Sequence, residues 1–246
     1  MFAWAGSVCF VASLGYFLFT YATRFGIVTP GPLRAGAVAW DVALFSAFAM
    51  HHSVFAREPV RRWVTRACPT LERSVYVWVA SVLLILVCWL WQPVAGVVWD
   101  IDGSGAWMLR ILQLAGIALS VYSAVLIDIW ELAGTRQLDS TPNAPLRNSP
   151  LPTPNSQGLG VGPVGSGEFS TRGPYGWVRH PIYLGWFLLV FSVGTMTMTR
   201  LVFGAVSCVY VLIAIPFEER SLRKTTGGAY ERYVRRVRWR LLPRVY

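Results

Sequence analysis

The chain has 246 residues, of which 54% are hydrophobic and only 14% are charged. Soluble domains carry about 25% charged residues, so a soluble domain of this size could not cover so much apolar surface. The composition therefore excludes a disordered chain, a coiled coil and a collagen. Together with 12 Trp, 10 Tyr and 13 Phe, it predicts a polytopic membrane protein, because aromatic residues gather at membrane interfaces.

The net charge of +10 comes from 22 basic and 12 acidic residues. A strongly basic chain suggests nucleic-acid binding, but here the charges lie in the loops between apolar segments, which disfavours that function. The four cysteines are far apart and none forms a CxxC pair. We therefore predict neither a metal site nor a disulfide framework.

Six apolar segments follow along the chain, each near the length of about 20 residues that a helix needs to cross a bilayer. They are Phe2–Ala22, Leu33–Phe55, Ser74–Pro93, Ala106–Ala133, Ile182–Thr199 and Leu201–Phe217. The last two are nearly continuous, so Gly194 and Thr195–Arg200 are interpreted as the turn of a helical hairpin. The pattern predicts an all-α integral membrane bundle of about six transmembrane helices.

The basic residues predict the orientation of this bundle, because cytoplasmic loops are enriched in Lys and Arg. With the N-terminus inside, the inner segments 56–73, 134–181 and 218–246 hold 18 of the 22 basic residues. The outer side keeps only Arg24, Arg34, Arg110 and Arg200. We expect a multi-pass protein of the bacterial inner membrane with both termini in the cytoplasm.

The chain is expected to form one membrane domain over residues 1–246, with four spans in 2–133 and a C-terminal part in 173–246. Between them, residues 139–172 are rich in Pro and Gly and poor in large apolar side chains. Such a stretch buries too little surface to fold alone, which favours a flexible cytoplasmic linker. A lid over an active site is the alternative, since long loops often carry function.

The densest polar pattern is Gly173–Gly185, which reads Gly-Pro-Tyr-Gly-Trp-Val-Arg-His-Pro-Ile-Tyr-Leu-Gly. Pro181 suits the first turn of a helix, because its missing N–H group is not needed there. Arg179 and His180 are therefore placed at a helix N-terminus, where an anionic group such as a carboxylate can bind. Snorkelling charges and interfacial aromatic residues are the alternative interpretation.

A second pattern begins with Glu218 and Glu219 at the end of the sixth apolar segment. Adjacent carboxylates are unfavourable there unless they face water or a partner, so we expect the helix to continue into the cytosol as far as Gly227-Gly228. After this break, apolar residues at i, i+3, i+4 and i+7 oppose a row of arginines. The pattern predicts a basic amphipathic helix that anchors to anionic lipid; its apolar stripe is Tyr230, Tyr233, Val234 and Val237.

The order of these motifs resembles the membrane methyltransferases, which include isoprenylcysteine carboxyl methyltransferase and the phospholipid methyltransferases. The resemblance covers Gly173–Pro243 and rests on Arg-His-Pro-x-Tyr-x-Gly, an apolar hairpin, Glu-Glu-x-x-Leu, Gly-x-x-Tyr-x-x-Tyr and a final Leu-Pro. It implies a methyl transfer from S-adenosylmethionine at the cytoplasmic side, with Arg179 and His180 as candidate catalytic residues. The residues expected to bind the cofactor are Gln137, Tyr175, His180, Pro181, Ile182, Tyr183, Glu218, Glu219, Tyr230 and Tyr233.

The rest of the chain resembles the branch that contains methanethiol S-methyltransferase and nurim. The matching stretches are 52–57, 63–66, 72–76, 89–93 and 128–137. This resemblance implies a small thiol as methyl acceptor, and His52, where the resemblance starts, is a candidate acceptor residue. Trp89, Trp91 and the uncharged run Val209–Phe217 are expected to wall off a small apolar pocket for the acceptor next to Arg179 and His180. The run Val209–Phe217 lacks the arginine that prenylcysteine enzymes carry near the position of Ala214, which disfavours a prenylcysteine substrate.

Three other functions stay open at this point. One is an isoprenylcysteine or phospholipid methyltransferase, and another is a membrane sterol or enone reductase that uses NADPH and has a similar C-terminal tail. The third is a non-enzymatic, nurim-like membrane protein. The Glu-Glu pair of this chain favours an enzyme instead. The protein's oligomeric state is not predicted from the sequence.

A few polar residues within or beside the apolar segments need separate interpretation. His51 and His52 are a poor metal pair because consecutive residues lie on different helix faces, so each is expected to be hydrogen-bonded inside the bundle. Asp41 needs a buried partner that the sequence does not name. Asp128 and Glu131 share a helix face and are expected to pair with Arg136 or with loop arginines.

Overall fold

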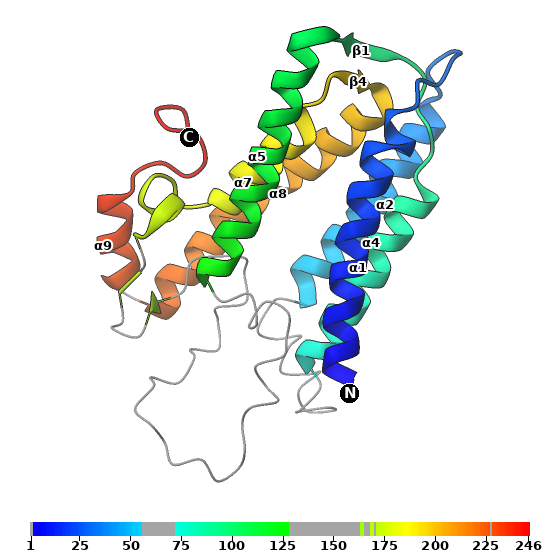
Figure 1. Ribbon diagram of the computed structural model, residues 1–246. Helices are drawn as coiled ribbons and strands as arrows, with labels where there is room; N and C mark the ends of the chain where they lie inside the picture. The colour runs from blue at the N-terminus through cyan, green and yellow to red at the C-terminus, as the bar shows by residue number, and fades with distance from the viewer. Residues whose placement is uncertain (1, 56–71, 128–162, 165–167, 170, 227) are drawn as a thin grey trace.

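The computed structural model describes residues 2–55, 72–127, 163–164, 168–169, 171–226 and 228–246, and this part of the chain is mainly helical (Figure 1). The helices are α1 (Phe2–Ala22), α2 (Ala35–Phe55), α4 (Glu72–Leu90), α5 (Gly103–Ile127), α7 (Pro181–Phe191), α8 (Met198–Thr226) and α9 (Gly228–Arg236). Two short 3-10 helices, η1 (Arg24–Gly26) and η3 (Gly173–Gly176), precede α2 and α7. The strands are β1 (Val97–Asp100), β2 (Pro163–Val164), β3 (Glu168–Phe169) and β4 (Thr195–Thr197).

Three helical segments among the described residues are long and apolar enough to cross a membrane: Ala5–Gly26, Gly103–Ile127 and Met198–Thr226. Val75–Leu90 and Pro181–Phe191 are apolar but shorter. The predicted count of six spans is therefore not confirmed. In particular, the 11 residues of α7 extend about 16 Å at 1.5 Å per residue, roughly half the thickness of a bilayer core.

The connection between α7 and α8 differs from the predicted all-α fold. In place of the expected tight turn between two helices, residues Thr195–Thr197 form β4, which pairs antiparallel with β1. Trp99 adds a hydrogen bond from its indole Nε1 to the carbonyl of Val193 at 3.0 Å. Backbone N–H and C=O groups beside an apolar bundle need partners, and this pairing supplies them where the helix stops.

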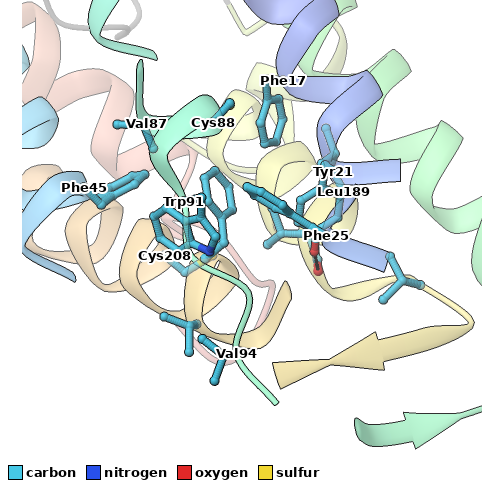
Figure 2. Packing of buried hydrophobic residues seen from close by; sticks show 14 of the residues in the cluster. Phe17, Tyr21, Phe25, Phe45, Val87, Cys88, Trp91, Val94, Leu189 and Cys208 are labelled. Atoms are coloured by element: carbon cyan, nitrogen blue, oxygen red, sulfur yellow. Dashed lines mark hydrogen bonds between the residues drawn. The ribbon is translucent and has the colours of Figure 1, made fainter. Parts of the chain in front are cut away.

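The described helices form two packed groups that meet at α8 (Figure 1). Helices α1, α2 and α4 pack together, whereas α5 packs along α7, and α8 contacts both α2 and α7. The main core lies where the groups meet (Figure 2) and is rich in aromatic rings. Phe203 of α8 contacts the rings of Phe17 and Trp91, with centroid distances of 5.3 and 5.2 Å.

Two of the four arginines predicted for the outer connections bind the carboxyl ends of helices. Arg24 donates hydrogen bonds to the carbonyls of Cys88, Trp89 and Trp91 at the end of α4. Arg200 is buried and donates to the carbonyls of Tyr21 and Ala22 at the end of α1. The last carbonyls of a helix have no partner within it and favour positive charge, so these side chains stabilise the helix ends.

Asp41 has a buried partner for one of its two carboxylate oxygens, while Oδ2 has none among the described residues. The side chain is fully buried, and its Oδ1 accepts a hydrogen bond of 2.8 Å from the backbone N–H of Gln92. The contact joins α2 to the segment that follows α4, on the same side of the bundle as the Arg24 contacts. Asp41 therefore lies far from the polar Arg179-His180 pattern at the start of α7.

The close packing of α5 on α7 depends on two glycines that face each other. A Cβ atom on Gly116 would lie 2.7 Å from the carbonyl oxygen of Gly185, so a larger residue would force the helices apart. Ser120 Oγ donates to the carbonyl of Ile182 at 3.1 Å, and Gln113 Nε2 donates to that of Leu189 at 2.9 Å. Small residues and interhelical hydrogen bonds of this kind are typical of membrane helix pairs, and here they position the first turn of α7.

Candidate active site

The Arg179-His180 pair is held by a segment that follows it by sixty residues. The backbone N–H of Arg179 donates to the carbonyl of Trp239, and that of His180 donates to the carbonyl of Arg240, both at 2.9 Å. Pro181 begins α7 directly afterwards. The two N–H groups that we expected to be available for an anion are thus paired with the C-terminal segment, and the side chains project from a fixed backbone.

Glu219 is the centre of the buried charge cluster at this site. Its side chain is 1% exposed, and its Oε1 accepts from Arg179 Nε at 2.8 Å and lies 3.3 Å from His180 Nε2. Its Oε2 accepts from Arg240 Nε and lies near Arg240 Nη2, both at 3.2 Å. Both oxygens are engaged by basic side chains, which balances the burial of the carboxylate.

Glu218 differs from its neighbour because half of its carboxylate has no partner among the described residues. Oε2 accepts a hydrogen bond of 2.9 Å from the hydroxyl of Tyr183 and lies 3.9 Å from His180 Nδ1. Oε1 is buried and has no hydrogen-bond partner in the described part of the chain. A buried acceptor of this kind favours a donor from outside the chain, and a cationic donor suits it best.

Aromatic rings surround this carboxylate pair. The ring of His180 stacks on that of Tyr183 with a centroid distance of 5.5 Å and an interplanar angle of 9°. The buried hydroxyl of Tyr175 donates to the carbonyl of Ser123 on α5 at 3.2 Å. Tyr233 in turn donates to the carbonyl of Tyr175 at 3.0 Å. These contacts tie η3, α5 and α9 into one frame around the charged cluster.

The apolar face of α9 packs against protein, which corrects the predicted lipid-anchoring stripe. Tyr230, Tyr233 and Val237 are buried in a cluster with Tyr175 and Leu222. Burial raises the pKa of the Tyr230 and Tyr233 hydroxyls well above the ordinary value, and the nearby carboxylate of Glu219 adds to the effect. The stripe therefore docks α9 against the end of α8 and leaves its arginines exposed.

The structure brings together most residues that the sequence predicts for the site. Eight of the expected cofactor residues lie on η3, α7, α8 and α9, and His180 caps the start of α7 with Arg179 beside it. The eight are Tyr175, Pro181, Ile182, Tyr183, Glu218, Glu219, Tyr230 and Tyr233. Gln137, Asp128, Glu131 and most of the 139–172 loop lie outside the described residues. The end of that loop forms β2 and β3, and Phe169 packs its ring against Tyr233 at 5.5 Å.

The predicted acceptor residues do not gather at the cluster, and the expected pocket between the tryptophans and Arg179 is wrong. Trp89 is 62% exposed near the C-terminal end of α4, whereas Trp91 is buried against Phe25 and Phe203. Phe203 and Glu218 are 15 residues apart on α8, which separates them by about 22 Å along the helix axis. Trp91 therefore belongs to the core and Trp89 to the surface, both at the end of the bundle away from the charge cluster.

His52 lies inside the bundle, as expected for a hydrogen-bonded histidine. Its Nδ1 is 2.7 Å from the hydroxyl of Tyr76 on α4. One residue further along α2, Ser53 Oγ is 2.7 Å from the hydroxyl of Tyr210 on α8. These polar pairs connect α2 to α4 and α8.

Two residues of the site were missed by the sequence analysis. Arg240 contacts Glu219, but it stands in a tail with many arginines, and composition does not distinguish it from its neighbours. Phe169 covers the tyrosines of α9 from a stretch that was interpreted as a linker. A lone aromatic residue in a segment rich in Pro and Gly is the signal that could have indicated a docked end.

Comparisons with known proteins agree with this arrangement. The model of the isoprenylcysteine carboxyl methyltransferase (ICMT) family matches residues 162–224, which contain both the Arg179-His180 motif and the Glu218-Glu219 pair. No solved structure matches the chain.

Three relatives extend the similarity over most of the chain. A methanethiol S-methyltransferase of Crocosphaera subtropica is 35% identical over 207 residues, covering 82% of this chain and 73% of the relative. Methanethiol S-methyltransferase 2 of Bradyrhizobium diazoefficiens is 33% identical over 245 residues, covering 98% and 87%. Nurim of Sus scrofa is 25% identical over 194 residues, covering 76% and 68%.

The family match, the named relatives and the apolar helices define an integral membrane methyltransferase. The chain belongs to the ICMT family, in the branch that contains the methanethiol S-methyltransferases and nurim.

Proposed function

We propose that the protein transfers a methyl group from S-adenosylmethionine to the sulfur of a small thiol such as methanethiol. The observation that carries the proposal is the buried Oε1 of Glu218, which has no hydrogen-bond partner among the residues that the structure describes and lies beside the stacked rings of His180 and Tyr183. Every other carboxylate oxygen of the Glu218-Glu219 pair is engaged. The names of the bacterial relatives support the thiol as acceptor.

The residues present fit this cofactor. S-adenosylmethionine carries an ammonium group, which suits the free oxygen of Glu218 as a charged hydrogen-bond donor. Aromatic faces such as Tyr183 suit its sulfonium charge, because a cation is attracted to the face of a ring. When bound, the cofactor supplies an electrophilic methyl group. We assign Glu219 to a different role, since its oxygens are already held by Arg179, His180 and Arg240.

The chain's own residues act mainly by positioning. Methyl transfer to sulfur is a single displacement, so the alignment of donor and acceptor supplies much of the rate. Tyr183 and His180 hold the Glu218 carboxylate in place, and the buried frame of Tyr175, Tyr230 and Tyr233 excludes water from it. Positive charge on Arg179 or His180 favours the thiolate form of an acceptor, because a nearby cation lowers the pKa of an acid.

The preference for a short acceptor rests on the side chains of α8. The run Val209–Phe217 contains no charged residue, so it offers no basic group to bind the carboxylate of a prenylcysteine. The polar groups on this stretch and its neighbours are hydroxyls, such as Tyr210 and Ser53. A small neutral thiol needs only a narrow path between apolar side chains to reach the charge cluster.

The test uses purified protein in detergent, S-adenosylmethionine labelled in its methyl group, and three acceptors: methanethiol, a farnesylcysteine analogue and a phospholipid amine. We expect label in the product of methanethiol and little turnover of the other two. Preference for the prenylated acceptor or the lipid amine would contradict the thiol acceptor while leaving the methyl transfer intact.

A ligand-binding control separates the cofactor from the acceptor. S-adenosylhomocysteine at 100 times its dissociation constant should stabilise the protein by about 2.7 kcal/mol, and NADPH should not. Stabilisation by NADPH alone would favour a reductase, and stabilisation by neither would favour a non-enzymatic role.

A further inference from the structure

The C-terminal segment presents an exposed surface of aromatic and basic side chains next to the site. We define the tail surface as Trp177, Arg238, Trp239, Leu242 and Val245, all of which are exposed. Trp177 is 74% exposed. A hollow of about 390 Å³ lies on this surface, and its lining includes Trp177, Arg238, Trp239 and Pro243.

The tail surface lies where an apolar segment ends. Trp177 precedes the apolar helix α7 by four residues. Just before it, Gly173 lies against Tyr122 and Leu126, in the last turns of the apolar helix α5. The surface is therefore located at the end of two apolar helices, the level at which a bilayer gives way to its headgroups.

The side chains of the tail surface match the chemistry of that layer. Tryptophan is enriched at membrane interfaces because its ring is apolar and its N–H group is polar. Arginine binds phosphate through charge-assisted hydrogen bonds, and basic residues near the surface attract anionic lipids. The tyrosine stripe of α9 is buried in the protein. The lipid contact that the sequence suggests for α9 is therefore assigned to the neighbouring tail surface.

The backbone of the same segment holds the site. The carbonyls of Trp239 and Arg240 accept the N–H groups of Arg179 and His180. The carbonyl of Arg238 accepts from Arg179 Nη1 at 2.5 Å, and the side chain of Arg240 contacts Glu219. A ligand that fixes the tail surface therefore also fixes the groups that orient the charge cluster.

We propose that an anionic phospholipid of the membrane binds the tail surface, with its phosphate at Arg238 and its apolar part against Trp177 and Trp239, and that this contact stabilises the site. The effect on cofactor affinity rests on the function proposed above; the lipid contact and its effect on the backbone do not.

The primary experiment measures amide hydrogen exchange of the full chain in nanodiscs of phosphatidylcholine alone and of phosphatidylcholine with phosphatidylglycerol. The readout is the peptide that contains Arg179 and His180. We expect slower exchange of this peptide in the anionic nanodiscs. Equal exchange in both would overturn the proposal. Soluble glycerol 3-phosphate added to the neutral nanodiscs should have no effect, and protection by it would show that a free phosphate is the ligand instead.

A pair of matched variants assigns the effect to the tail surface. In Trp177→Ser/Arg238→Ser the difference between the two nanodiscs should disappear. In Trp107→Ser/Arg110→Ser, which removes another exposed Trp-Arg pair from the opposite end of α5, it should persist. Loss of the difference in both variants, or in neither, would contradict the assignment.

The effect of lipid on function is measured as the Kd for S-adenosylmethionine in the same two nanodiscs. Anionic lipid should lower this Kd about fivefold, the lower end of the coupling that is typical between two binding sites, and only when the tail surface is intact. Lipid-dependent exchange without any binding of S-adenosylmethionine would contradict the proposed function and leave the lipid site standing. An unchanged Kd despite lipid-dependent exchange would show that the contact does not reach the cofactor.

Discussion

Nε of Arg179 donates a hydrogen bond of 2.8 Å to Oε1 of Glu219, and both side chains are almost completely buried. The pair joins the segment before α7 to the last third of α8, so one ion pair connects the Arg-His-Pro motif to the Glu-Glu motif within the part of the chain that matches the family. It also gives the adjacent glutamates different roles. Glu219 binds three basic side chains, whereas one oxygen of Glu218 has no partner in the described part of the chain, which supports the proposal that it binds a ligand.

Replacing each glutamate should therefore have a different result. Glu219→Ala leaves the buried guanidinium of Arg179 without its carboxylate, which we expect to destabilise the fold by about 3–5 kcal/mol. Glu218→Gln keeps the oxygen that accepts from Tyr183, so the fold should survive. It should weaken S-adenosylmethionine by about 1.5–3 kcal/mol, the contribution of a charged hydrogen bond. Thermal unfolding in detergent and calorimetry of cofactor binding measure the two effects; an unchanged affinity in Glu218→Gln would remove Glu218 from the site.

The packing of α5 on α7 makes a second prediction. Gly116→Ala places a methyl group 2.7 Å from the carbonyl of Gly185, and such overpacking usually destabilises by about 1–3 kcal/mol. Gly15→Ala in α1 is the matched control, because no atom lies within 4 Å of the added carbon. Alanine there should stabilise the helix slightly. The melting temperatures of the two variants in detergent check this, and a similar drop in both would mean that the glycine contact is not the cause.

The buried tyrosines of α9 should make the protein sensitive to alkali. Burial raises the pKa of the Tyr230 and Tyr233 hydroxyls above about 10, the ordinary value in an unfolded chain. Their contribution to stability is therefore fully present below pH 10 and is lost progressively as the pH rises above it. Thermal unfolding between pH 8 and pH 11 should show this loss. The double variant Tyr230→Phe/Tyr233→Phe should lose less stability over the same range, and an identical loss would exclude these two groups.

The orientation predicted from the basic residues is open to a direct test. Because 18 of the 22 basic residues fall in segments assigned to the inside, reporter tags at Met1, within residues 139–172 and after Tyr246 should all report the cytoplasm. A matched tag at Gly31, in an outer connection, should report the opposite side. A terminus found outside would reverse the placement of the charge cluster relative to the membrane.

The sequence alone was sufficient to predict a helical membrane protein and, apart from Arg240, the residues of its charge cluster. Apolar runs near the length of a bilayer require helices, since a backbone in lipid must satisfy its own hydrogen bonds. The positions of Pro181 and Gly227-Gly228 predicted where α7 begins and where α8 stops, and the structure has α7 beginning at Pro181 and α8 ending at Thr226. The joint spacing of Arg-His-Pro and Glu-Glu was specific enough to indicate the family.

Only the tertiary structure decided how each of these residues is used. Adjacent glutamates look equivalent in a sequence, but the helix turns by about 100° per residue and aims one at three basic groups and the other at Tyr183. The stripe of α9 is amphipathic whether it meets lipid or protein, and only packing shows that Tyr230 and Tyr233 face Tyr175 and Phe169. Arg240 is one arginine among many until the tail folds back beside Arg179. Local patterns determine helices and their ends, whereas the choice of partner depends on contacts between segments that are distant in the chain.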